Sequence, residues 1–226
     1  MEIHRPKPAR NWREFAKEVG VIVVGVCIAL AGEQAVAWLH WRNEISETRN
    51  ALNKEVAYNL GAMQKRREEA VCIDRRLAEI KGLLRHSPAG PSSAARAPLG
   101  QPQLFRPHTN VWQAALAGQA AAHMPLKMRL SYAEAYDGFQ WYGQKAADET
   151  DAWGELAELD DGAPLGAEDE VSLRRARSRA QVAADKLNAN LPGYGAIGAR
   201  LGVAPAPIHE SALTAAALKA LCRPLS

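Results

Sequence analysis

Aromatic residues are scarce in this sequence, and no alternating run of β-branched residues follows its first forty positions. Both shortages argue against a β-sheet protein. Only 6% of the 226 residues are aromatic, whereas alanine, leucine, glutamate and arginine are abundant, a composition that favours helices. The sequence therefore predicts an all-α fold. A strong excess of positive charge is also missing, because the net charge is only +3, so we expect no nucleic-acid partner.

Signatures of catalysis and of metal binding are lacking as well. The six histidines are scattered without His-Glu-x-x-His spacing, and the sequence holds no cysteine pair with ligand spacing, no Gly-x-Ser-x-Gly elbow and no phosphate loop. Residues 193–198 match the dinucleotide pattern by letters, but they follow a helix and Pro192 rather than a strand. We interpret them as a loop that ends that helix. We expect no metal, no cofactor and no enzymatic activity; an active site assembled from distant residues is the alternative.

What the sequence does contain is an uncharged run at residues 19–38, interrupted by a single acidic residue, Glu33. A helix rises ~1.5 Å per residue, so about 20 apolar residues cross a hydrocarbon core ~30 Å thick. Glu33 would lie roughly 21 Å along a helix that enters the core at Val19, so about 9 Å from the far boundary. We predict a transmembrane helix over residues 19–41, with Glu33 in its outer part.

Aromatic side chains bracket this predicted span. Trp12 and Phe15 precede it and Trp38 and Trp41 close it, and such amphipathic rings favour the headgroup levels of a bilayer. The basic residues before the span are Arg5, Lys7, Arg10, Arg13 and Lys17. Soon after the span, basic residues are fewer and alternate with glutamates, so the positive-inside rule predicts a cytoplasmic tail at residues 1–18. Everything after Trp41 is then expected outside the cytoplasm.

A cleavable signal peptide is the alternative to an anchor, because residues 29–31 read Ala-Leu-Ala and Gly32 follows. Against cleavage, the segment before the apolar run is long and carries Glu14 and Glu18. The apolar run also resumes after the cleavage motif. We favour the uncleaved anchor.

Small residues form one face of the predicted span. Gly25, Ala29 and Gly32 recur at helical spacing, and Glu33 borders them beside Gln34. Small faces let helices approach closely in lipid, and a polar group can then hydrogen-bond across the pair. We therefore expect a contact with a second copy or with another membrane protein at these five residues. Two alternatives stay open: an ion-coupling carboxylate at Glu33, or a hydrated acid with no special role.

The remainder of the chain predicts a helical domain. We expect a long helix over residues 42–86 that continues from the span, a Pro/Gly/Ser linker or loop at 87–109, and the rest of the domain at 110–226. The helices expected in that last part cover residues 111–122, 126–159, 167–191 and 211–221. The long helix carries a stripe with three-four spacing that predicts a core face rather than a coiled-coil seam. We expect two to four further helices to pack on it as an irregular bundle.

The predicted helix over 126–159 carries most of the aromatic residues of the domain. Its apolar face begins at Leu126 and Leu130, and Tyr132, Tyr136 and Trp141 lie beside that face. Such rings usually fill space in a helical core. The alternative is that these three rings line a ligand cleft.

Two cysteines lie outside the predicted span, Cys72 on the long helix and Cys222 near the C-terminus. An oxidising compartment would favour a disulfide between them, which would join the C-terminal tail to the long helix. Two free buried thiols are the alternative.

The N-terminal part of the chain carries a recognisable set of features: the W-R-E-F motif at 12–15, Glu18, residues 22–26, Ala29, Leu30, Glu33, Gln34, Trp38, Trp41 and Arg42. With these features it resembles the start of an uncharacterised family of bacterial single-pass membrane proteins. The positions of Cys72 and Cys222 are similar too. The resemblance implies a bacterial inner membrane and a periplasmic domain, and it implies no activity or catalytic residue.

These observations together predict a membrane-anchored periplasmic protein that acts as an interaction or accessory subunit. Its expected partners are the lipid bilayer and, through the span, a second copy or another membrane protein. The first alternative is a periplasmic small-ligand binder or enzyme that uses the region from Tyr132 to Trp141. The second is an ion-coupled membrane subunit that uses Glu33.

Overall fold

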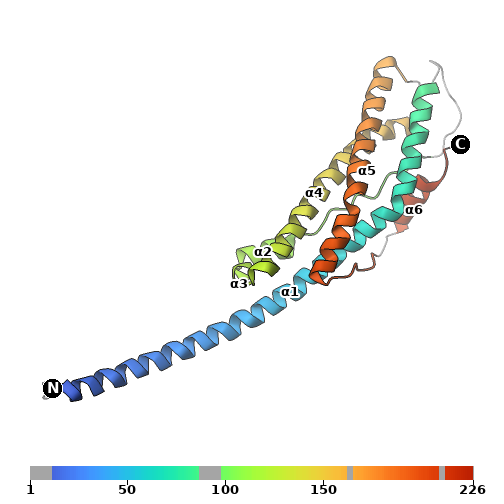
Figure 1. The fold of residues 1–226 in the computed structure, drawn as a ribbon. Helices are drawn as coiled ribbons and strands as arrows, with labels where there is room; N and C mark the ends of the chain where they lie inside the picture. The colour runs from blue at the N-terminus through green and yellow to red at the C-terminus, as the bar shows by residue number, and fades with distance from the viewer. Residues whose placement is uncertain (1–11, 87–97, 162–164, 209–211, 226) are drawn as a thin grey trace, which may run out of the picture. The chain divides into compact units, whose positions relative to one another are not determined.

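The computed structural model describes residues 12–86, 98–161, 165–208 and 212–225, and these residues form helices without any strand. The all-α prediction is confirmed. The elements in chain order are α1 (Trp12–His86), α2 (Asn110–Ala117), α3 (Ala120–His123), α4 (Leu126–Leu156), a 3₁₀ helix η1 (Ala157–Asp161), α5 (Ala167–Leu201) and α6 (Ala212–Cys222). Figure 1 labels the helices α1 to α6.

The chain divides into two compact units. The N-terminal unit comprises Met1–Glu47, and its described part is the first portion of α1. The bundle comprises Thr48–Ser226 and contains the rest of α1 together with all other helices. One helix thus supplies residues to both units.

Within the bundle, the direction of each long helix follows from its contacts. The Tyr132 hydroxyl of α4 donates to Asn53 on α1, and Glu149, farther along α4, pairs with Arg66, farther along α1. The two helices therefore run parallel. Tyr194 on α5 bonds the carbonyl of Gly138 on α4, whereas Arg200 at the end of α5 pairs with Glu134, so α5 runs antiparallel to α4.

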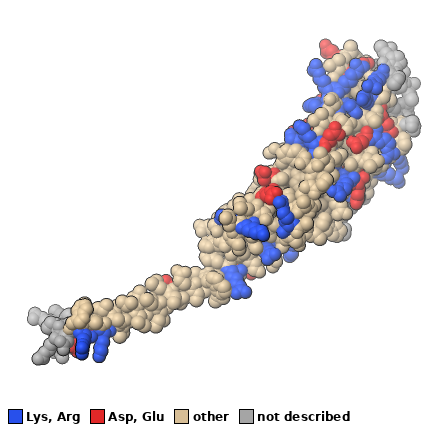
Figure 2. All heavy atoms as spheres, in the orientation of Figure 1, with Lys and Arg blue, Asp and Glu red and all other residues tan. Residues whose placement is uncertain are grey.

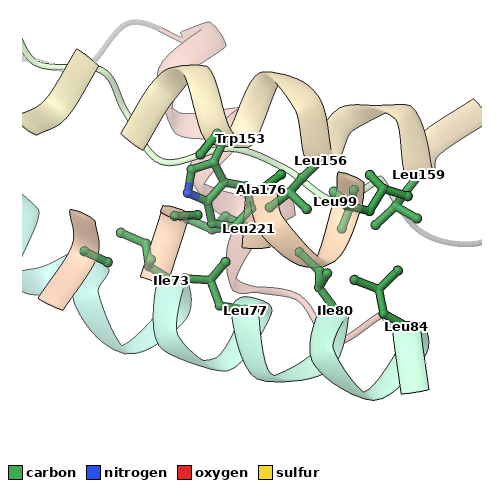
Figure 3. Packing of buried hydrophobic residues seen from close by; sticks show 14 residues of the cluster. Ile73, Leu77, Ile80, Leu84, Leu99, Trp153, Leu156, Leu159, Ala176 and Leu221 are labelled. Carbon is green, nitrogen blue, oxygen red and sulfur yellow. The ribbon is translucent and has the colours of Figure 1, made fainter. Parts of the chain in front are cut away.

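The core of the bundle is built from apolar stripes with helical spacing. On α1 the stripe expected from the sequence is buried at Leu52, Val56, Leu60, Met63, Ile73, Leu77, Ile80 and Leu84. Figure 3 shows its second half facing Trp153 and Leu156 of α4 and Ala176 of α5. The side of α5 that enters this cluster is mostly alanine, and small side chains allow helices to pack closely.

Part of the predicted linker is packed rather than loose. Residues 87–97 lie outside the described part of the chain, whereas residues 98–109 have no regular secondary structure but run against the bundle. Leu99 is buried. The side-chain amide of Asn59 donates to the carbonyl of His108 and accepts from its backbone N–H. These bonds hold the end of the segment just before α2 begins.

The predicted end of the last long helix is wrong, because α5 continues through Pro192 to Leu201. Proline inside a helix costs ~3 kcal/mol through its missing N–H and its steric clash with the preceding turn. Tertiary contacts outweigh that cost, since Leu191 beside the proline and Tyr194 and Gly198 beyond it are all buried. Gly202, with a φ of 67°, ends the helix in the left-handed conformation that glycine adopts without strain.

Residues 193–198 are therefore part of helix α5, neither a nucleotide-binding loop nor the helix-terminating loop that we expected. Gly198 is needed for close approach, because a Cβ there would lie 2.7 Å from Leu60 Cδ1 on α1. Gly193 and Gly195 have open space around them.

The single short helix expected at 111–122 is divided into α2 and α3. The break falls at Gly118 and Gln119, where Gln119 has a φ of 64°. An α-helix cannot pass through a left-handed residue, so the chain turns and starts again at Ala120. The next helix, expected at 126–159, ends its α-helical part at Leu156 and continues as η1.

Candidate functional site

The described part of the N-terminal unit is a helix with an uncovered apolar surface. One stretch of 18 residues within it has a mean hydropathy of 2.1, and none of that stretch is buried. Figure 2 shows this helix as a largely uncharged surface, whereas charged side chains are frequent on the visible face of the bundle. A helix that is apolar on all sides needs a nonaqueous environment, either lipid or other protein.

The small-residue face lies on this uncovered helix. A Cβ built on Gly25 or Gly32 meets no atom within 4 Å, so contacts within the described chain do not require glycine at either position. Ala29, Glu33 and Gln34 are exposed as well. The structure therefore leaves all five predicted contact residues accessible to a partner outside the chain.

The predicted interface anchors occur in two groups on α1. The rings of Trp12 and Phe15 lie 6.1 Å apart between centroids, in a tilted arrangement. The guanidinium carbon of Arg42 lies 5.1 Å from the ring centroid of Trp38, a cation–π contact. Trp41 is half-buried. An aromatic ring with a cation beside it, as at Trp38 and Arg42, suits the boundary between apolar and aqueous surroundings.

The aromatic rings predicted beside the α4 face belong mainly to the core. Tyr132 and Tyr136 are each only 1% exposed. Trp112 of α2 stacks on Tyr136, with 5.4 Å between ring centroids, and Tyr136 meets Phe139 edge to face. These two tyrosines therefore fill space between α1, α2 and α4, and they do not line a cleft.

The hydroxyl groups of these tyrosines bond to polar residues of α1. Tyr136 donates to Glu55 Oε1 over 2.7 Å, and the other carboxylate oxygen of Glu55 accepts from the backbone N–H of Val111 in the first turn of α2. Burial, reinforced by Glu55, raises the pKa of Tyr136, and burial also raises that of Tyr132. Both phenols remain protonated at neutral pH, so they act as hydrogen-bond donors rather than as bases.

A buried ion pair joins α1 to α4 near the middle of the bundle. Arg66 and Glu149 meet at 2.8 Å, and both side chains are almost fully buried. Desolvation raises the pKa of Glu149, and Arg66 acts in the opposite direction. A buried carboxylate of this kind can mark an active site, but here it is paired within a helix interface, which is a structural use.

Cys72 and Cys222 form a disulfide, one of the two arrangements that the sequence left open. Close to it, Arg76 is fully buried and donates to the carbonyls of Ala220, Leu221 and Arg223. The carbonyls of Ala220 and Leu221 lie in the last turn of α6 and that of Arg223 just after it, where a cation offsets the helix dipole. The disulfide and Arg76 together hold the C-terminal segment against α1.

Sequence reasoning missed Arg76. The available signal was its position, since Arg76 lies between Ile73 and Leu77 within the apolar stripe of α1. A charged residue in a buried stripe implies a buried partner.

Trp141 lies apart from the two buried tyrosines, in an open depression of about 570 Å³ between α4 and α5. Glu134, Asp137, Tyr194 and Arg200 also line this depression. Glu134 is already paired with Arg200, and Tyr194, whose pKa burial raises to about 12, donates its hydroxyl to a backbone carbonyl. The depression therefore offers surface but no nucleophile paired with a base.

A second, basic depression of about 200 Å³ lies between α1 and α5, lined by Lys81, Arg85, Arg174 and Arg177 around Leu84. Two of its arginines already form hydrogen bonds to α1: Arg174 donates to the Leu84 carbonyl and Arg177 to the Leu77 carbonyl. Arg174 thus satisfies a carbonyl in the last turn of α1, whereas Arg177 bonds a carbonyl nine residues before the end of that helix. Across the described residues, no group of three His, Cys, Asp or Glu side chains is placed to hold a metal ion.

Comparison with protein-family models, with curated proteins and with solved structures found no match to this chain.

Proposed function

We propose that this chain is a single-pass protein of the bacterial inner membrane, with a cytoplasmic N-terminus and a periplasmic helical bundle that acts as an interaction or accessory subunit. The observation that carries the proposal is the uncovered apolar helix of the N-terminal unit. A soluble protein of this size would bury such a segment, whereas the bundle has its own core without it.

The absence of enzymatic activity is part of the proposal. Three of the buried polar and charged groups that could serve chemistry have structural partners: Glu55 with Tyr136, Arg66 with Glu149, and Arg76 with carbonyls of the C-terminal segment. The alternative that uses the region from Tyr132 to Trp141 loses support because its two tyrosines are core residues.

Membrane insertion and orientation are tested together on the full chain carrying a C-terminal tag. The proposal predicts that the chain stays in the membrane pellet after an alkaline carbonate wash. It also predicts that protease added to spheroplasts removes the tag, while inside-out vesicles protect it. Release by carbonate, or protection in spheroplasts, would contradict the proposal. The intact mass decides the signal-peptide alternative, because cleavage after Ala31 would leave Gly32 as the first residue.

The proposed helix contact is tested by disulfide cross-linking of single cysteines in a Cys27→Ser background. If two copies pair through the small face, Gly25→Cys, Ala29→Cys and Gly32→Cys yield dimers, and Val23→Cys and Leu30→Cys on the opposite face do not. Equal yields on both faces would indicate random collision. If the partner is another protein, these same positions should cross-link to that protein.

Glu33 separates contact from ion coupling. Glu33→Gln keeps the size and the hydrogen-bonding capacity but removes the titration, so a contact role predicts unchanged association. Glu33→Leu removes both properties and should weaken association. A phenotype that Glu33→Gln reproduces in full would instead favour the ion-coupled alternative.

A further inference from the structure

Helix α5 packs along most of α4 but does not reach its first two turns. Arg200, one residue before the end of α5, pairs with Glu134 on α4. Because the two helices are antiparallel, the part of α4 before Glu134 has no α5 beside it. Leu126 and Leu130, one turn apart on the same face, are 59% and 57% exposed. The sequence placed both leucines on a core face, and the early end of α5 is the reason that this expectation is wrong.

These two turns lie at the end of the bundle through which the chain enters it. Tyr132, two residues after Leu130, bonds Asn53, and α4 runs parallel to α1, so Leu126 and Leu130 lie toward Thr48. Thr48 follows Trp41 by seven positions. Seven residues span about 10 Å as a helix and at most about 25 Å when fully extended. Whatever its path, the connecting chain lets Thr48 lie at most about 25 Å from Trp41.

The chemistry of the exposed turns suits a lipid surface. Lys127 and Arg129 alternate with the two leucines, and Leu126 and Leu130 are both more than half exposed. Segments that insert shallowly at a bilayer combine large apolar side chains with cations, because the apolar groups reach the acyl boundary while the cations meet headgroup phosphates. On the next turn the face becomes acidic at Glu134 and Asp137, which limits the apolar part to these two turns.

We propose that Leu126 and Leu130 insert into the outer-leaflet surface of the membrane that holds the N-terminal unit, with Lys127 and Arg129 at the phosphate level. This inference rests on the proposed function, since it requires that residues 19–41 span that membrane. The bundle is then held to the bilayer at two places, the span and the start of α4, which restricts its orientation on the membrane.

The test uses the full chain in phosphatidylcholine–phosphatidylglycerol nanodiscs, with a nitroxide on single cysteines in a Cys27→Ser background and the native disulfide left oxidised. Leu126→Cys and Leu130→Cys are the probes. Val182→Cys is the matched control, an apolar residue of α5 that is 49% exposed. Val24→Cys reports on the span. Power saturation with oxygen and with a neutral nickel chelate measures lipid and water exposure of each label.

Labels at 126 and 130 should show an oxygen-to-nickel accessibility ratio several-fold above that at 182. Equal ratios at all three positions would overturn the inference, provided that the Val24 label lies in lipid. Low accessibility of the 126 and 130 labels to both reagents would also overturn it, because it would indicate a protein partner or a second copy on this face. A water-exposed Val24 label would instead contradict the proposed function itself.

Discussion

The two portions of α1 have the same backbone structure but opposite surroundings. Up to His40 every described side chain is exposed, including the large apolar ones, whereas beyond Thr48 the apolar residues are buried at three-four spacing. The distribution of apolar residues distinguishes the two portions, because the first is apolar on all sides over residues 19–32 and the second is apolar along one stripe. The pattern therefore identifies what surrounds each portion: lipid for the first, in our proposal, and protein for the second.

Ionisable residues follow the same division. In the bundle, the buried Arg66 and Arg76 have bonded partners within the chain. In the N-terminal unit, Glu33 is on an exposed helix surface. The buried arginines are explained by packing within the bundle. Glu33 is accessible either to a partner outside the chain or to water, and the Glu33 variants proposed above distinguish these two roles.

The largest effect that separates the two units should come from the disulfide. Cys222→Ser removes the disulfide, which joins residues 150 positions apart. The chain-entropy model gives a loss of about 4–5 kcal/mol in the free energy of unfolding for a loop of this length. We expect the bundle to unfold at much lower denaturant concentration, without any change in membrane association. Chemical denaturation in detergent micelles measures the effect. Cys27→Ser is the control and should change nothing; equal stability of the two variants would contradict the account.

A smaller effect should come from a cavity in the core. Leu77 is fully buried, so Leu77→Ala should destabilise the bundle by about 3 kcal/mol through lost burial and the remaining void. Leu30→Ala removes the same atoms from the uncovered portion of α1, where the side chain is 54% exposed. It should leave the unfolding of the bundle unchanged. Similar losses from both variants would show that the two units unfold as one, against the division made here.

The Tyr136–Glu55 bond should contribute less again. Tyr136→Phe keeps the stacked ring but leaves Glu55 Oε1 without its donor in a buried place, at a cost of about 1–2 kcal/mol. Tyr58→Phe is a suitable comparison, because Tyr58 lies at the surface with its ring stacked on His108. We expect thermal unfolding of the bundle to shift for the first variant only.

The smallest effect near neutral pH is that of tyrosine ionisation, which becomes large only in alkali. Burial raises the pKa of Tyr132, Tyr136, Tyr142 and Tyr194, the last to about 12. The folded bundle thus favours the protonated phenols, so their contribution to stability is complete below about pH 10 and is lost as the pH rises toward 12. Absorbance at 295 nm should show these tyrosines ionising together with the loss of helical circular dichroism. Ionisation of all five tyrosines of the chain near pH 10, with the helices intact, would argue against the buried cluster.

Much of the fold could be predicted because it depends on local periodicity. The stripe from Leu52 to Leu84 and the helical composition were sufficient for the all-α class and for the core face of α1. The features that were missed depend on distant contacts. The continuation of α5 past Pro192 rests on the burial of Tyr194 and Gly198, and the exposure of Leu126 and Leu130 rests on where α5 ends.

Contacts among the candidate site residues could be predicted only where the sequence left few possible partners. Cys72 and Cys222 were the two cysteines outside the span, so one pairing was available, although free thiols remained an alternative until the structure joined them. Tyr132, Tyr136 and Trp141 were grouped by their closeness in sequence. Helical geometry separates them, because the first two face α1 and α2 whereas Trp141 lies in the depression beside α5.

The central claim, that lipid covers the N-terminal unit, is tested most directly through Cys27. Its thiol is exposed on the helix surface, and the other two cysteines form the disulfide, so a maleimide reports on this position alone. In native membranes Cys27 should resist a water-soluble maleimide and should react fully once the membrane is dissolved in SDS, because alkylation requires the thiolate and water. The control is Val182→Cys in a Cys27→Ser background, and its thiol should react with the same maleimide in spheroplasts without detergent. Rapid modification of Cys27 in intact membranes would contradict the account.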